Sequence, residues 1–322
     1  MTAEPVFDRA ARRWDQVGQG PVRDLVGYGS DVPLVHWPGG ARVAVSVVLN
    51  IEEGSERSPA FGDADNEPNW ETPRDFPRGV RDLSTESVFE YGSRAGVHRA
   101  LRVLREFEVP ATAFASAVAL AVNPDAVRQL IDDGHEVCCH GWRWTEQWTM
   151  TREEERRRIH DAVELIEELT GTRPVGWYSR YGPSVHTREL LHEAGFTYDC
   201  DAYNDDLPYY VAVRGAPHLV IPYSAVYNDC HFADKYSCAD DFLSDLRRAL
   251  DHLWREGAQR PRMMSVGLHP RIVGQAARAD ALREFLAYAR GKGGVWFARR
   301  DEIAQVWLTQ FPPSAPDPGA GR

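Results

Sequence analysis

The sequence predicts an α/β protein built as a distorted (β/α) barrel of seven or eight strands. Short apolar, β-branched segments alternate along the chain with amphipathic segments of helical period, which is the pattern of parallel strands joined by helices. The number of strand segments suits a closed or nearly closed barrel. Residues 50–54, which follow the first strand, contain neither a GxGxxG nor a P-loop pattern. An open nucleotide-binding sheet is therefore the weaker alternative.

The composition indicates a soluble cytoplasmic protein. The chain has 322 residues, of which 43% are hydrophobic, enough for one large α/β domain. A net charge of -11 argues against nucleic acid or an anionic membrane as a partner. No apolar stretch approaches the roughly 20 residues that span a bilayer. The five cysteines fit neither a disulfide framework nor CxxC metal spacing, so we expect free thiols in a reducing compartment.

The predicted elements alternate regularly along the chain. We expect strands at residues 42–51, 109–117, 135–139, 175–178, 196–200, 219–221, 263–268 and 295–297. We expect helices at residues 94–107, 123–133, 152–169, 187–194, 240–254, 282–288 and 302–307. Pro124 suits the first turn of the second helix, and Thr151 with Glu154 forms a capping box for the third.

Three segments flank or interrupt this alternation. Residues 1–40 lack a clear period and are predicted to form an N-terminal arm on the domain or on a neighbouring subunit. Residues 41–310 are the predicted barrel, and residues 311–322 are a predicted disordered tail. Residues 55–84 form a long aperiodic loop directly after the first strand. Loops of this length in compact domains are usually functional, so we expect a lid over the site.

The first strand ends in polar residues where a parallel sheet carries its chemistry. Residues 45–54 read Val-Ser-Val-Val-Leu-Asn-Ile-Glu-Glu-Gly, a buried apolar strand that stops at Asn50, Glu52 and Glu53. Carboxylates at the end of a buried strand are usually paired with another polar group or have a functional role. Adjacent strand residues point to opposite faces, so Asn50 and Glu52 share a face. Glu53 reaches the same site only if the chain has already turned there.

Other predicted strands also end in polar or charged residues. These strand-end residues are Glu52, Glu53, His140, Arg180, Asp201 and His269. A single such residue is usually structural, but its recurrence at successive strand ends indicates one site. A carboxylate can take a proton from water, a histidine can protonate a leaving group, and an arginine can stabilise a carbonyl oxygen. The set therefore predicts hydrolysis.

Four motifs resemble those of the polysaccharide deacetylases, the NodB-homology family. Residues 50–54 resemble the Thr-Phe-Asp-Asp-Gly motif, and residues 140–144, His-Gly-Trp-Arg-Trp, resemble the His-Ser/Thr-x-x-His motif. Residues 179–182 lie where Arg-x-Pro-Tyr is expected, and residues 268–270 resemble the late histidine motif. The resemblance covers residues 40–310 and implies a NodB-like barrel that hydrolyses C–N bonds outside peptides.

Two departures bear on the metal that this family implies. In metal-dependent members the second Asp and both histidines bind a divalent cation, whereas this chain has Glu53 and Trp144 at two of those positions. Tryptophan has no lone pair for a metal, and two ligands fall short of the three of a catalytic zinc. We expect no cofactor. The alternative is a divalent cation such as zinc on Glu53 and His140, with His231 or Asp201 as a third ligand.

These departures resemble the metal-independent allantoinase branch of the family. The matching runs are Trp37-Pro-Gly-Gly-Ala-Arg, Leu49-Asn-x-Glu-Glu-Gly, Glu90-Tyr-Gly-Ser-Arg-Ala-Gly, His140-Gly-x-Arg-Trp, Gly176-Trp-Tyr and Asp205-Asp-Leu-Pro-Tyr. The resemblance implies hydrolytic opening of a cyclic amide, such as allantoin, a hydantoin or a cyclic imide. It also implies a homo-oligomer, often a tetramer. The residues after Arg180 differ from the sequence expected in this branch, so the identity of the substrate stays open.

By position, the resemblance implies a role for each site residue. Glu52 would be the general base, His269 the general acid, and Arg180 the group that polarises the carbonyl. The predicted substrate-binding residues are Asn50, Glu53, His140, Trp142, Trp144, Tyr178 and Asp201. Trp142, Trp144 and Tyr178 would form flat walls around a planar ring, although barrel packing explains Tyr178 equally well.

Two other functions remain open at this point. One is a metal-dependent deacetylase of N-acetylated carbohydrates. The other is an inactive barrel that binds only a ligand, which the presence of both Glu52 and His269 argues against.

Overall fold

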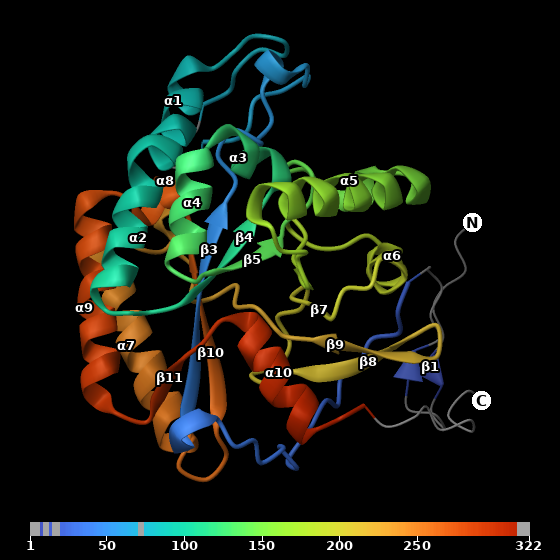
Figure 1. Ribbon diagram of the computed structural model, residues 1–322, viewed down its shortest axis with the longest axis vertical. Coiled ribbons are helices and arrows are strands. Elements are labelled where there is room, and N and C mark those ends of the chain that lie inside the picture. Colours follow the sequence, from blue (N-terminus) through green and yellow to red (C-terminus); the bar gives the residue numbers. More distant parts are fainter. Residues whose placement is uncertain (1–6, 9–12, 15–19, 70–73, 314–322) are drawn as a thin grey trace.

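A curled parallel sheet forms the centre of the molecule. The computed structural model describes residues 7–8, 13–14, 20–69 and 74–313 (Figure 1). The strands of the main sheet are β3 (Val43–Ile51), β4 (Ala111–Ala115), β5 (Glu136–Cys139), β6 (Gly176–Trp177), β7 (Tyr198–Asp199), β8 (Tyr209–Val213), β9 (Ala216–Val220), β10 (Arg262–Leu268) and β11 (Val295–Phe297). Their order is β10-β3-β4-β5-β6-β7-β9-β8, with β11 also paired to β3. All these pairings are parallel except that of β8 with β9.

The sheet curls far enough for its two ends to approach each other. The amide of Met263 in β10 donates to the carbonyl of Asp206, which precedes β8, at 3.2 Å. The amide of Gly267 donates to the carbonyl of Tyr227 at 2.8 Å. These bonds link β10 to the segments around the β8–β9 hairpin without completing a strand ladder. The result is the incomplete barrel that the sequence predicts.

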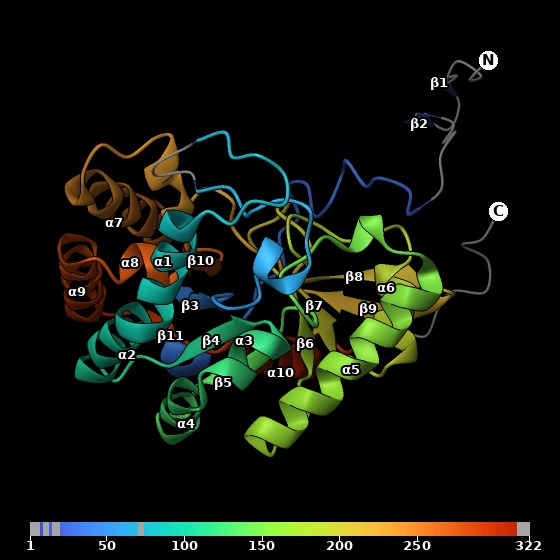
Figure 2. The same cartoon turned by 90° about the horizontal axis from the view of Figure 1, so that it is seen from above.

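Helices pack around the sheet, most of them on its outer face. They are α1 (Leu83–Tyr91), α2 (Val97–Glu106), α3 (Ala117–Val122), α4 (Pro124–Asp132), α5 (Arg152–Thr170), α6 (Thr187–Glu193), α7 (Ala239–Glu256), α8 (Pro270–Val273), α9 (Ala276–Lys292) and α10 (Arg300–Gln310), with a π-helix at Gly92–Gly96. The packing runs in sequence from α7 to α9, α2, α4, α5 and α6 (Figures 1 and 2). None of the helices in the described part of the chain is both long enough and apolar enough to cross a membrane.

Two apolar clusters fill the fold. One lies between sheet and helices and includes Leu49, Leu101 and Phe285, all fully buried. The other fills the barrel interior around Phe114 and Tyr223, whose rings lie 5.2 Å apart. Because parallel strands covered on both faces have no solvent side, β3 is apolar along almost its whole length.

All predicted strands and helices are present in the structure, but several observed elements were not predicted. Thr151 caps α5 by accepting from the amide of Glu154 at 3.2 Å. The prediction did not include α1, the π-helix, α3, β8, α8 or the two-residue strands β1 (Phe7–Asp8) and β2 (Arg13–Trp14). These elements are short or, like α1, lie in segments with weak amphipathic period, so tertiary contacts decide them. The predicted tail beyond residue 313 and most of residues 1–19 lie outside the described residues.

Candidate active site

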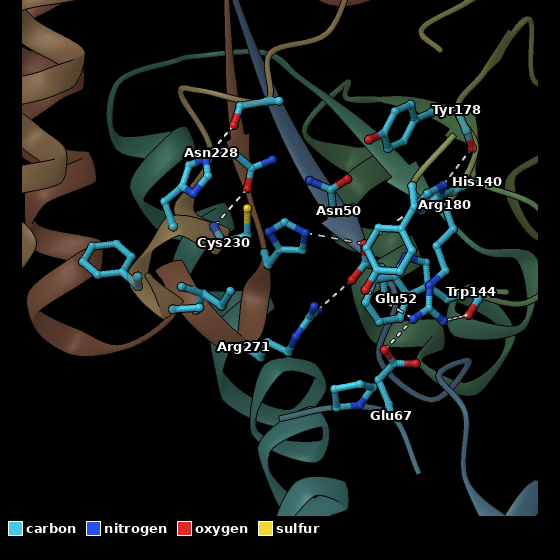
Figure 3. A pocket seen from close by; sticks show the side chains of 18 of the residues that line it. Asn50, Glu52, Glu67, His140, Trp144, Tyr178, Arg180, Asn228, Cys230 and Arg271 are labelled. Carbon is cyan, nitrogen blue, oxygen red and sulfur yellow. Dashed lines mark hydrogen bonds and ion pairs between the residues drawn. The ribbon is translucent and has the colours of Figure 1, made fainter. Parts of the chain in front are cut away.

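A cavity of about 320 Å³ opens at the carboxyl end of β3 and its neighbours. The loop that follows β3 lies at this end of the barrel (Figure 2), and its residues Glu67, Pro68 and Asn69 line the cavity. The other lining side chains come from strand ends, α1, α8 and the segment after β9. Those used below are Asn50, Glu52, Phe89, His140, Trp144, Tyr178, Arg180, Tyr203, Tyr223, Asn228, Cys230, His269 and Arg271 (Figure 3).

Glu52 is the centre of the polar contacts in this cavity. It follows the last residue of β3 and is 1% exposed. Its Oε1 lies 3.5 Å from Nε2 of His140 and 3.5 Å from Nε2 of His269. Its Oε2 accepts a hydrogen bond of 2.8 Å from Arg271 (Figure 3). Burial raises the pKa of Glu52, but the charges of Arg271 and His269 outweigh this and hold the pKa well below its usual range.

His269 follows β10 and is held by a buried carboxylate. Its Nδ1 lies 2.6 Å from Oδ1 of Asp229, and its backbone amide donates to Oδ2 of Asp229 at 2.8 Å. Burial lowers the pKa of His269, but the charges of Glu52 and Asp229 together raise it to about 9. The imidazole is therefore protonated at neutral pH, with Nε2 directed to Glu52.

His140 follows β5 and approaches Glu52 from the other side. Its Nδ1 lies 2.7 Å from the carbonyl oxygen of Tyr178, so Nδ1 donates and Nε2 faces Oε1 of Glu52. The imidazole also stacks on the ring of Tyr178 at a centroid distance of 5.0 Å. These two contacts fix the orientation of the ring beside the carboxylate.

Arg271 and Glu53 contact each other and both contact Glu52. Oε1 of Glu53 accepts from the backbone amide of Arg271 at 3.2 Å and lies 3.4 Å from its Nη1. Oε2 of Glu53 accepts from the amide of Glu52 at 3.2 Å. A Cβ at Gly92 would lie 2.5 Å from Oε1 of Glu53, so the glycine makes room for this carboxylate. Burial raises the pKa of Glu53 although Arg271 opposes the effect.

Arg180 ties the loop after β3 to the barrel. Its Nη2 donates to Oε1 of Glu67 at 2.5 Å, and its Nη1 donates to the carbonyl of Trp144 at 2.6 Å. Its guanidinium lies 3.9 Å from the centroid of the Trp144 ring. Both charged side chains of this ion pair are at most 2% exposed. The predicted lid residues therefore contact the site through Glu67.

Aromatic rings form one wall of the cavity. Tyr178 stacks on Phe114 at 4.6 Å, and its hydroxyl lies 2.6 Å from that of Tyr203. Asn50 donates to the hydroxyl of Tyr223 and to the carbonyl of Leu268, both at 3.1 Å. Asn50, Trp144 and Tyr178 therefore all line the cavity, as predicted.

Three of the predicted substrate-binding residues, Trp142, Glu53 and Asp201, do not line this cavity. Trp142 lines a different cavity beside α5, because Gly141, with φ of 88°, turns the chain away after His140. Glu53 faces Gly92 and Arg271, because the chain has not turned enough to bring both glutamates into one space. Asp201 accepts from the amide and hydroxyl of Ser179, each at 2.7 Å, and burial raises its pKa to about 7.

Several cavity residues were missed by the sequence analysis. They are Arg271, Glu67, Phe89, Tyr203, Tyr223, Asn228 and Cys230. Asp229, which was also missed, does not line the cavity but contacts Nδ1 of His269. Arg271 lies two residues after His269, and this proximity could have drawn attention to it. Glu67 and Tyr223 lie far from every motif in the sequence, and only the folded chain brings them together.

The residues present do not fit the divalent cation that the family resemblance implies. No group of three or more His, Cys, Asp or Glu side chains that could hold a metal ion occurs within the described ranges. Of the alternative ligands, Glu53 faces away from the cavity and Asp201 is bound to Ser179. His231 has its Nδ1 2.9 Å from Asp234 and its Nε2 2.6 Å from the carbonyl of Ala225. Trp144 offers no lone pair where a second histidine would lie.

The arrangement brings together an ionised carboxylate, a protonated histidine and two arginines in one partly aromatic cavity. Such a set can deprotonate water and protonate a leaving group. An α/β barrel with these groups at its carboxyl strand ends has the architecture of a hydrolytic enzyme.

Comparison with known proteins shows the family to which the chain belongs. The family model for polysaccharide deacetylase matches residues 82–198. A Schizosaccharomyces pombe protein described as a polysaccharide deacetylase is 36% identical over 90% of this chain and 98% of its own length. The chain therefore belongs to the polysaccharide deacetylase family, and it is a hydrolase of that superfamily acting on C–N bonds.

Two solved structures share the fold over nearly the whole chain. A Pseudomonas aeruginosa PAO1 protein described as a polysaccharide deacetylase has a TM-score of 0.87 at 44% identity, covering 91% of this chain and 99% of its own. The structure of PuuE allantoinase has a TM-score of 0.87 at 45% identity, with the same coverage. These similarities confirm the predicted NodB-like barrel.

Proposed function

We propose that this protein is a hydrolase that opens a small cyclic amide, such as allantoin, a hydantoin or a cyclic imide, without a bound metal ion. The observation that carries the proposal is the position of Oε1 of Glu52, 3.5 Å from Nε2 of both His140 and His269. The similarity to PuuE allantoinase supports a cyclic amide as the substrate class.

The protonation states suit a general base and a general acid at neutral pH. Glu52 is ionised because its pKa lies well below the usual range, so it accepts a proton from the attacking water. His269 is protonated because its pKa is about 9, so it donates a proton to the departing ring nitrogen. Asp229 orients the imidazole and stabilises its charge through the contact of 2.6 Å at Nδ1. His140 holds the water against Glu52.

The shape of the cavity suits a compact planar substrate. The cavity measures about 320 Å³ and is closed on one side by Glu67 of the long loop. Trp144 and Tyr178 offer flat surfaces on which a five-membered ring can lie. An extended carbohydrate chain would instead need an open groove along the strand ends.

The proposal is tested by hydrolysis assays on protein whose metal content has been measured and which has been stripped with a chelator. Allantoin, hydantoin, a cyclic imide and an N-acetylated chitooligosaccharide are the substrates. We expect turnover of a cyclic amide by the metal-free protein. Activity that disappears with chelator and returns with zinc would overturn the metal-independent mechanism, and release of acetate alone would make the deacetylase the correct function.

We also propose that the chain acts as a homo-oligomer, as the family resemblance implies. Leu25 and Val26, which lie within the predicted arm, are 76% and 79% exposed. Large apolar side chains exposed side by side are typical of a surface that another subunit covers.

A further inference from the structure

We infer that the guanidinium of Arg271 takes the place of a catalytic cation: it fixes the Glu52 carboxylate and binds the substrate carbonyl oxygen as water adds. This role presupposes the hydrolysis proposed above.

The first support is the position of Arg271 in the cavity. Its Nη1 donates to Oε2 of Glu52 at 2.8 Å (Figure 3), whereas the two histidines approach Oε1. Its side chain is only 11% exposed, yet it lines the cavity. Its Nη2 and Nε donate to no described residue. A buried cation with uncommitted N–H groups beside the general base is suited to hold developing negative charge.

The second support is that both departures from the metal-binding pattern of the family contact Arg271. Glu53 accepts from the backbone amide of Arg271 at 3.2 Å and lies 3.4 Å from Nη1. Trp144 presents its ring 5.1 Å from the Arg271 guanidinium, and Phe89 presents its ring at 4.7 Å. A carboxylate and two aromatic faces are the surroundings that favour a guanidinium. The two positions at which the chain departs from the family's metal ligands are thus occupied by residues that contact Arg271.

Arg180 is less suited to the carbonyl oxygen, although its sequence position suggested that role. Its Nη1 and Nη2 are bound to the carbonyl of Trp144 and to Glu67, and its Nε lies 3.7 Å from Glu146. Both terminal nitrogens of Arg180 thus already donate to protein groups, whereas the printed side-chain contacts of Arg271 with Glu52 and Glu53 use Nη1 alone. We therefore assign loop attachment to Arg180 and the oxyanion to Arg271.

The proposed step balances without a metal or another reactant. The water oxygen forms a bond to the carbonyl carbon while its proton passes to Glu52. The π electron pair of the carbonyl moves to its oxygen, where the Arg271 N–H groups bind it. The tetrahedral intermediate then collapses, the C–N bond breaks, and the ring nitrogen takes the proton of His269.

The test combines three variants with chemical rescue. Arg271→Ala removes the charge, and Arg271→Lys keeps it with a smaller set of donors. Arg99→Ala is the matched control, because Arg99 bonds Tyr91 and the carbonyl of Gly274 beside α8 but does not line the cavity. We expect Arg271→Ala to lose about 10²–10³-fold in kcat, as on removal of an oxyanion donor. Millimolar guanidinium chloride should restore part of that loss in Arg271→Ala and in neither of the other variants. The kcat of Arg271→Lys should lie between that of the native chain and that of Arg271→Ala.

Failure to respond to guanidinium, with the fold intact by circular dichroism, would mean that Arg271 only supports the structure. A loss of kcat in Arg99→Ala equal to that in Arg271→Ala would also mean that Arg271 only supports the structure. Arg180→Ala supplies a further comparison: if guanidinium rescues that variant and not Arg271→Ala, the oxyanion belongs to Arg180.

Zinc titration by calorimetry gives a readout that needs no substrate. We expect no stoichiometric zinc binding by the native chain, and a gain of binding in Arg271→Ala, which leaves Glu52 and Glu53 without their cation. Stoichiometric binding by the native chain would overturn the role of Arg271 even if cyclic amides are hydrolysed. Absence of any hydrolysis by the native chain would overturn the proposed function, and calorimetry would still decide whether Arg271 excludes a metal.

Discussion

Replacing Asp229 with asparagine should lower the pH above which the enzyme loses activity. A general acid must be protonated, so activity of the native chain should fall as the pH rises through the His269 pKa of about 9. The rise from the ordinary value of 6.5 to about 9 corresponds to about 3 kcal/mol of preference for the charged imidazole. Glu52 and Asp229 supply this preference against the opposing effect of burial.

Asp229→Asn removes the negative charge that lies 2.6 Å from Nδ1 and leaves Glu52 in place. The asparagine oxygen can still accept from the backbone amides of His269 and Val273, which now bond Oδ2 of Asp229 at 2.8 and 3.1 Å. Its NH₂ group then faces Nδ1 and favours the neutral imidazole. We expect the pKa of His269 to fall by about one unit or more, which shifts the basic limb to lower pH by the same amount.

The assay is the pH dependence of kcat/KM for the best cyclic amide, measured for the native chain, Asp229→Asn and Asp234→Asn. Asp234 is the matched control, because it is exposed and pairs with His231. Its variant should keep the native profile. An unchanged basic limb in Asp229→Asn, with activity retained, would refute the assignment of His269 as the acid tuned by Asp229.

Three further predictions concern the base, the packing behind it and the assembly. Glu52→Gln should abolish hydrolysis while the thermal unfolding temperature stays near that of the native chain, and near-normal turnover would remove Glu52 from the mechanism. Gly92→Ala places a Cβ 2.5 Å from Oε1 of Glu53, so we expect a loss of about 1–3 kcal/mol in the free energy of unfolding and reduced activity. Gly291→Ala, where a Cβ meets nothing within 4 Å, should not destabilise the chain in the same denaturant titration. Leu25→Asp should reduce the molecular mass in sedimentation velocity if this surface joins subunits; an unchanged monomer mass in both proteins would contradict the oligomer.

The alternation of strands and helices could be predicted because local pattern decides it. Residues 43–51 are apolar on both faces, and the amphipathic segments carry the helical period, so the barrel class follows from the sequence. The short α8 could not be predicted, because four residues carry too little period. Its position depends on contacts of its backbone with Gly96 and with Glu53.

The sequence indicated the cavity residues that directly follow predicted strands. Glu52, His140, Arg180 and His269 line one cavity because parallel strands end at one edge of the sheet. Trp142 lies outside this cavity because the chain turns at Gly141, and this turn depends on a backbone angle rather than on residue type alone.

By itself the sequence determined the kinds of group available for chemistry and the order in which the strands present them. The tertiary structure alone decided which charges neutralise each other. Arg271 pairs with Glu52 and Glu53, while Arg180 pairs with Glu67 from a loop more than a hundred residues earlier. Charge interactions depend on distance through space and on burial, neither of which follows from spacing along the chain. For this reason Glu52 could be predicted as a site residue from its motif, and its pairing with Arg271 could not.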